Sequence, residues 1–70
     1  MKSVVAVFQN LTVSFPAKSQ YWSSLATAYV KIGRIQDAIS AARKVIELSS
    51  GDAATQAEAE QFIRALGGTP

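Results

Sequence analysis

The side chains of this chain that could take part in acid–base chemistry are five carboxylates, two tyrosines and a few lysines. Histidine and cysteine are absent, which excludes Ser-His and Cys-His nucleophiles and nearly all zinc sites. Glu58 and Glu60 are two positions apart and would point in different directions on a helix, so they do not form an acid–base pair. Gly67 and Gly68 follow a predicted helix instead of preceding one, which excludes a phosphate-binding loop. We therefore expect a protein that is not an enzyme, with no catalytic, metal-binding or cofactor-binding residue.

The basic residues are spread along the chain and do not form a cluster. Seven Lys and Arg against five Asp and Glu give a net charge of +2. The closest basic groups are Lys31 with Arg34 and Arg43 with Lys44, and these two pairs fall on different predicted helices. Phosphate binding needs several cations on one face, so we expect no nucleic-acid partner.

The apolar runs of the sequence are short. Gln9 and Asn10 interrupt the run that begins at Val4 after about five residues, below the roughly 7–15 of a signal peptide. No run approaches the roughly 18 apolar residues of a transmembrane helix, so we expect no membrane contact by this segment. The absence of cysteine is consistent with a reducing compartment, and we expect a cytoplasmic location.

Hydrophobic periodicity predicts an all-α fold of four helices, at residues 3–15, 19–32, 35–48 and 53–66. The two central helices each have an apolar stripe on one side. The stripe of the first contains Trp22, Leu25, Ala26, Tyr29 and Ile32, and that of the second contains Ile35, Ala38, Ile39, Ala42, Val45 and Ile46. The connection around Gly33 is so short that these two helices must pack antiparallel.

Residues that favour helix ends stand at the predicted boundaries. Ser3, Ser19 and Asp52 are placed to cap the first, second and fourth helices. Gly33 can adopt the left-handed conformation that ends the second helix. Residues 67–70 are expected to form a tail whose last two residues are disordered.

The central hairpin resembles a tetratricopeptide repeat (TPR). Trp22, Leu25, Ala26 and Tyr29, followed by Ala38, match the pattern W-x2-L-G-x2-Y…A, with alanine in place of the small glycine. The sequence departs from the pattern at Ala42, where the family has an aromatic residue, and at Ser50, where it has a proline. The resemblance implies that residues 19–52 form one complete repeat.

The first segment could also be a strand, because many of its residues are β-branched. The TPR period of about 34 residues favours a helix instead. One period before Ala38, Ala42, Val45 and Ser50 stand Val4, Phe8, Leu11 and Pro16. Residues 1–16 are therefore interpreted as the second helix of an incomplete preceding repeat. One period after Leu25, Tyr29 and Ile32 stand Ala59, Ile63 and Leu66, so residues 53–66 are interpreted as a capping helix of the same domain.

Proteins of the TPR family bind extended peptides or helices on a concave surface lined by the first helix of each pair. The resemblance therefore implies a protein or peptide partner, contacted by Gln20, Ser23, Ser24, Thr27, Val30 and Lys31. Tyr21 lies away from the centre of the apolar stripe and is a further candidate for partner contact, whereas Trp22 is expected to pack in the core. The competing interpretation is that these residues form an ordinary solvated surface.

About three repeats are needed for a stable TPR stack, and this chain has fewer. We therefore expect either a fragment of a larger protein or a chain that self-associates. The alternative function is a structural, homo-oligomeric segment that caps a larger protein. The self-association surface would be the uncovered side of the first helix, with Val4, Val5, Phe8 and Leu11.

Overall fold

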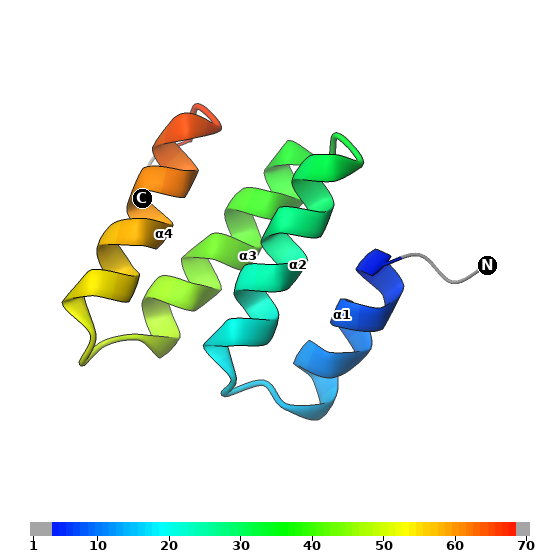
Figure 1. Cartoon of the computed structure of the whole chain (residues 1–70), viewed down its shortest axis with the longest axis horizontal. Coiled ribbons are helices and arrows are strands. Elements are labelled where there is room, and N and C mark those ends of the chain that lie inside the picture. Colours follow the sequence, from blue (N-terminus) through cyan, green and yellow to red (C-terminus); the bar gives the residue numbers. More distant parts are fainter. Residues whose placement is uncertain (1–3, 69–70) are drawn as a thin grey trace.

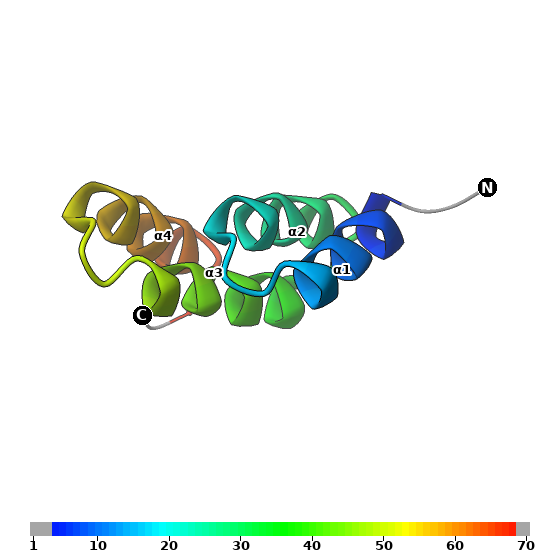
Figure 2. The same cartoon turned by 90° about the horizontal axis from the view of Figure 1, so that it is seen from below.

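The computed structural model describes residues 4–68, which form four α-helices in two layers. They are α1 (Val4–Ser14), α2 (Ser19–Lys31), α3 (Ile35–Leu48) and α4 (Ala53–Ala65). Each helix packs against the next in chain order (Figure 1), and α2 and α4 lie in one layer while α1 and α3 lie in the other (Figure 2). Residues 4–68 contain no strand, so the predicted all-α fold of four helices is confirmed.

The helix boundaries agree with the predicted ones to within about a residue. The prediction for α3 matches the structure, while α1, α2 and α4 each end one residue earlier than predicted. Ser19 was predicted to cap α2, and this is wrong. Ser19 is the first residue of that helix, and the capping position is held by Lys18, whose side chain makes no capping hydrogen bond. The predicted cap at Ser3 and the predicted disorder of the last two residues lie outside the described part of the chain.

Two glycines end α2 and α4 in the same way. Gly33 and Gly67 have φ values of 79° and 85°, in the left-handed region that costs other residues a steric penalty. After α2, the amides of Gly33 and Arg34 donate to the carbonyls of Val30 and Tyr29 over 3.0 and 2.9 Å. This pair of bonds is a Schellman motif, which satisfies carbonyl groups that the end of a helix would leave without partners. The same two bonds recur after α4.

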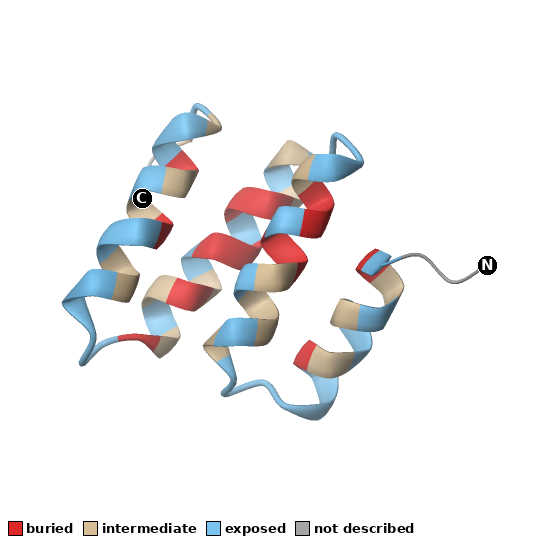
Figure 3. Cartoon of the chain, viewed as in Figure 1, coloured by how far each residue is buried: buried red, intermediate tan, exposed pale blue. Residues whose placement is uncertain are grey.

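The core consists largely of alanine side chains on facing helices. Six of the twelve buried apolar residues among residues 4–68 are alanines, and Ala38 is completely inaccessible to solvent. Figure 3 shows the buried residues concentrated on α2 and α3. Because a methyl group occupies little space, α2 and α3 can approach closely, and Leu25, Tyr29 and Ile39 fill the space beside the alanines.

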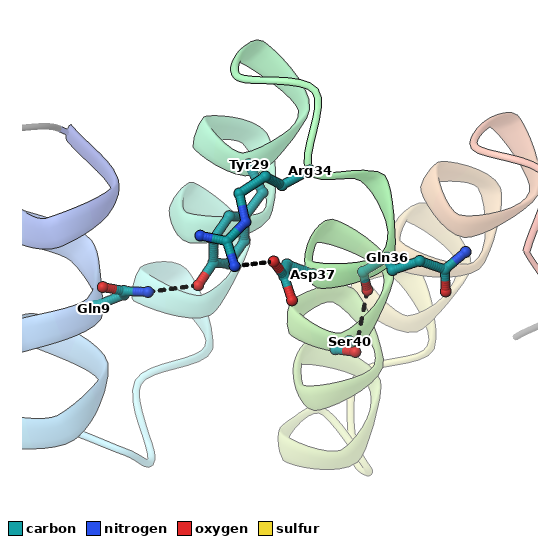
Figure 4. Close-up of polar contacts among 6 residues, drawn as sticks. All are labelled: Gln9, Tyr29, Arg34, Gln36, Asp37 and Ser40. Carbon is teal, nitrogen blue, oxygen red and sulfur yellow. Dashed lines mark hydrogen bonds and ion pairs between the residues drawn. The ribbon is translucent and has the colours of Figure 1, made fainter.

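Two aromatic residues of α2 connect the core to neighbouring segments. Trp22 is partly buried against the core, and its indole Nε1 donates a hydrogen bond of 2.9 Å to the Pro16 carbonyl in the preceding loop. Tyr29 is buried, and its hydroxyl accepts a 2.7 Å hydrogen bond from Gln9 Nε2 of α1 (Figure 4). The Arg34 guanidinium lies 5.4 Å from the centre of the Tyr29 ring and is paired with Asp37 at 2.6 Å. Tyr29 thus links α1, α2 and the turn that begins α3.

In the first helix, apolar residues recur at helical spacing at Val4, Val7, Phe8, Leu11 and Phe15, but the buried residues are others. Val5 and Thr12 are the buried residues of α1, whereas Val4 and Val7 are 60% and 45% exposed. Of the residues predicted to form a self-association surface, Val5 is part of the core and Phe8 packs partly buried against it. Ile32, expected in the apolar stripe of the second helix, is 55% exposed beyond the end of α2.

The conformation of Gly33 leads to a first prediction. Gly33→Ala should lower the free energy of unfolding by about 1 kcal/mol, because the added methyl disfavours a positive φ although no atom lies near it. Gly51→Ala is the matched control, since Gly51 also has open space around it but no positive φ. Urea unfolding, monitored by circular dichroism, measures the free energy of unfolding of both variants. Equal stability of the two variants would contradict the assigned turn.

The alanine contact between α2 and α3 leads to a second prediction. Ala38→Leu should destabilise the fold by about 1–3 kcal/mol, because the larger side chain must force two packed helices apart. Ala57→Leu places the same side chain on an exposed part of α4 and should change the stability little. Thermal melting of the two variants tests this. A melting temperature for Ala38→Leu at or above that of wild type would show that the helices are not in close contact.

Candidate functional site

A groove lies between α2 and α4, with α3 as its floor. Its volume is about 670 Å³. The two helices that form its walls lie in the same layer, and α3 lies in the other layer (Figure 2). The wall from α2 contains Ser19, Gln20, Ser23, Ser24, Ala26 and Thr27, the floor contains Ala42 and Val45, and the wall from α4 contains Asp52, Thr55, Glu58, Ala59 and Phe62.

The two walls differ in chemistry. The α2 wall is uncharged, and its hydroxyl and amide groups can both donate and accept hydrogen bonds. The α4 side has two carboxylates, Asp52 and Glu58, and these are the charged residues among those that line the groove. The floor residues Ala42 and Val45 and the ring of Phe62 are apolar. The groove thus has an apolar floor, one uncharged polar wall and one wall with negative charge.

Asp52 also fixes the start of α4. Its Oδ1 accepts a 3.1 Å hydrogen bond from the Thr55 backbone N–H, and its Oδ2 accepts a 2.6 Å bond from the Thr55 hydroxyl. These bonds confirm the predicted cap. They stabilise the charged carboxylate, the hydroxyl bond most, and so they lower the pKa of Asp52 below its usual value of 3.8. Asp52 therefore carries a negative charge at the end of the groove at neutral pH.

The structure brings together four of the seven residues that were predicted to contact a partner. Gln20, Ser23, Ser24 and Thr27 all line the groove. These positions recur every three or four residues and so form one face of α2.

The other three predicted residues lie elsewhere on α2. Lys31 borders a smaller hollow on the opposite side of α2, and Val30 packs against the core. The Tyr21 ring is partly buried and lies 5.9 Å from the centre of the Phe15 ring, next to the loop that follows α1.

The smaller hollow, of about 290 Å³, lies between α1 and α2. Val4 and Phe8 of α1 form one side of it, and Lys31 of α2 borders the other. Ser23, Ser24 and Thr27 line both hollows, so they form a polar ridge between them. The ridge therefore has a cation on its α1 side and two carboxylates on its α4 side.

The α4 wall of the groove was not predicted, although the sequence contained a partial signal for it. Glu58 stands one TPR period of about 34 residues after Ser24, which was a predicted groove residue. Asp52 was predicted as a cap, but its place in the same groove as Ser19 and Gln20 depends on how α4 packs on α3. Gln56 of α4 contributes to that packing through a 3.4 Å hydrogen bond from its Nε2 to the Ile46 carbonyl.

No protein-family model matches the sequence, and comparisons with curated proteins and with solved structures found no match. Within residues 4–68, no group of three acidic, histidine or cysteine side chains is placed to hold a metal ion. No helix in this part of the chain is long and apolar enough to cross a membrane.

The lowered pKa of Asp52 leads to a third prediction. Because the carboxylate is stabilised only in the folded state, its contribution to stability is present above the pKa of the unfolded chain and is lost as the pH falls through the lower pKa of the folded chain. Asp52→Ala should therefore melt at a lower temperature than wild type at neutral pH. The difference should shrink as the pH falls below 3.8.

Thr55→Val is a second variant that tests the lowered pKa of Asp52. It removes the hydroxyl donor but keeps the backbone N–H, so the pKa of Asp52 should rise toward its usual value. Carbon-13 NMR titration of the Asp52 carboxyl reads this pKa directly. A carboxyl that titrates identically in wild type and Thr55→Val would contradict the assigned cap.

Proposed function

We propose that the chain is a non-catalytic protein-interaction module whose groove between α2 and α4 binds a peptide segment. The single observation that carries this proposal is the lining of the groove, which has an apolar floor, hydrogen-bonding groups along one wall and carboxylates along the other. Peptide-binding grooves combine these features, because apolar contacts supply affinity and polar groups fix orientation. The proposed role needs no cofactor.

The charge of the groove supports a basic peptide as the partner. Asp52 and Glu58 lie on one wall, and no cation is present among the described residues that line the groove. A Lys or Arg side chain of the ligand would complement these carboxylates, whereas an acidic segment would be repelled by them. An apolar side chain of the same segment would contact Val45 and Phe62.

The arrangement of the helices supports a TPR-like interpretation of this site. The resemblance implies binding on the surface lined by the first helix of each pair, and α2 would be such a helix, with α4 one period later. Both helices lie in one layer (Figure 2). Residues of both line the groove. The starts of α2 and α4, Ser19 and Ala53, are also separated by 34 residues (53 − 19), the period of that family.

A selection experiment tests the proposal and provides a fourth prediction. Panning a phage-displayed library of random peptides against the immobilised chain should enrich sequences that contain Lys or Arg beside apolar residues. Addition of a synthetic copy of an enriched peptide should shift amide NMR signals of groove residues such as Ser23, Thr27 and Glu58. Shifts confined to residues away from the groove would contradict the proposal.

Charge-reversal variants distinguish binding in the groove from non-specific electrostatic attraction to the protein surface. Glu58→Lys should weaken binding of the enriched peptide about tenfold, because a cation then replaces a carboxylate in the wall. Glu47→Lys changes the net charge equally but lies on an exposed position of α3 away from the groove, and it should leave the affinity nearly unchanged. Equal loss of affinity in both variants would show that the groove is not the binding site.

A further inference from the structure

The groove between α2 and α4 and the smaller hollow between α1 and α2 adjoin each other across α2. Ser23, Ser24 and Thr27 line both spaces, so α2 is the element that lies between them. Figure 2 shows α2 with α4 on one side and α1 on the other. A peptide segment bound in the groove can therefore extend over this polar ridge into the hollow.

The ridge offers hydrogen-bonding groups to such a segment. Ser23 and Thr27 are exposed, and Ser24 is partly exposed. The Thr27 hydroxyl donates a 3.2 Å hydrogen bond to the Ser23 carbonyl, which leaves its oxygen able to accept another. Within the described part of the chain, the hydroxyls of Ser23 and Ser24 make no hydrogen bond. The N–H and C=O groups of a peptide backbone can therefore bond to the ridge where the segment crosses it.

The two spaces carry charges of opposite sign. Asp52 and Glu58 lie on the α4 side of the groove, whereas Lys31 is the charged residue among the described residues that line the hollow. Lys31 and Glu58 are exposed, and neither forms an ion pair with another residue that the structure describes. Val4 and Phe8 form an apolar side of the hollow. Charges of both signs are therefore available to one ligand that reaches both spaces.

We propose that the peptide segment bound in the groove also crosses α2 and places an Asp or Glu side chain beside Lys31. Its basic side chain then lies beside Asp52 and Glu58, and its acidic side chain lies in the hollow between α1 and α2. Charge complementarity selects this ligand and its direction, because the reversed segment would bring like charges together in both spaces. This inference rests on the proposed function, since the groove binds the basic half of the same segment.

The width of α2 sets the spacing of the two charges in the ligand. A helix with its side chains is roughly 10–12 Å across, and an extended chain advances about 3.3 Å per residue. The basic and acidic residues must therefore be at least about three positions apart in the ligand. Lys31 is exposed, so its ion pair should change the affinity only about two- to fivefold. Its main effect is on which peptides are selected.

Parallel panning of a phage-displayed library of random peptides tests the inference. Wild type should enrich peptides with Lys or Arg and, at least about three positions away, Asp or Glu. Peptides enriched by Lys31→Glu should keep the basic residue and lose the acidic one. Arg64→Glu is the matched control and should select like wild type. Arg64, like Lys31, is an exposed basic residue in the last turn of its helix, but it lines neither space.

Calorimetric titration with a synthetic copy of an enriched peptide separates this inference from the proposed function. A second copy, with Asn or Gln in place of the acidic residue, should bind wild type about two- to fivefold more weakly and should bind Lys31→Glu no more weakly than the acidic copy. Circular dichroism checks that the variants stay folded. Equal binding of the two copies to wild type, or an acidic preference kept by Lys31→Glu, would overturn the inference. The groove itself fails only if Glu58→Lys leaves the affinity unchanged.

Discussion

The structure depends on the close packing of α2 against α3 through alanine side chains. Ala26, Ala38, Ala41 and Ala42 are each at most 3% exposed and belong to one core cluster. A core made of small side chains gains less from hydrophobic burial than one made of leucine or phenylalanine. The larger residues that supply most of this burial, Leu25, Tyr29, Ile39 and Ile63, surround the alanines. The alanine contact therefore determines the distance between α2 and α3 through close packing, and it contributes less through the apolar area that it buries.

Different sides of α2 face different neighbours, and the residue types differ from side to side. One side packs on α3, one receives α1, and a third forms the polar wall of the groove. The Tyr29 hydroxyl accepts a hydrogen bond from Gln9 of α1, while the Tyr29 ring lies beneath Arg34 at the entrance to α3. Substitutions on α2 would therefore affect several contacts together, and their effects on stability should not be additive.

The groove between α2 and α4 combines apolar and charged groups. The groove has an apolar floor, but its rim is polar and negatively charged through Asp52 and Glu58. The helix α1 differs from the groove in that it carries no charged side chain and leaves Val4 and Val7 exposed. The carboxylates of the groove would attract a basic segment.

The sequence by itself determined the number and type of the helices, their boundaries to within about a residue, and the turns at Gly33 and Gly67. These features are local, because hydrophobic periodicity and glycine conformation depend on residues a few positions apart. Four predicted residues on one face of α2 do lie together in the groove. Only the tertiary structure decided that Val5 and Thr12, instead of Val4 and Val7, face the core, and that α4 supplies the second wall. The apolar residues of α1 lie on more than one side, so periodicity alone cannot choose its buried face. That choice depends on which neighbours, distant in sequence, are present to cover each side.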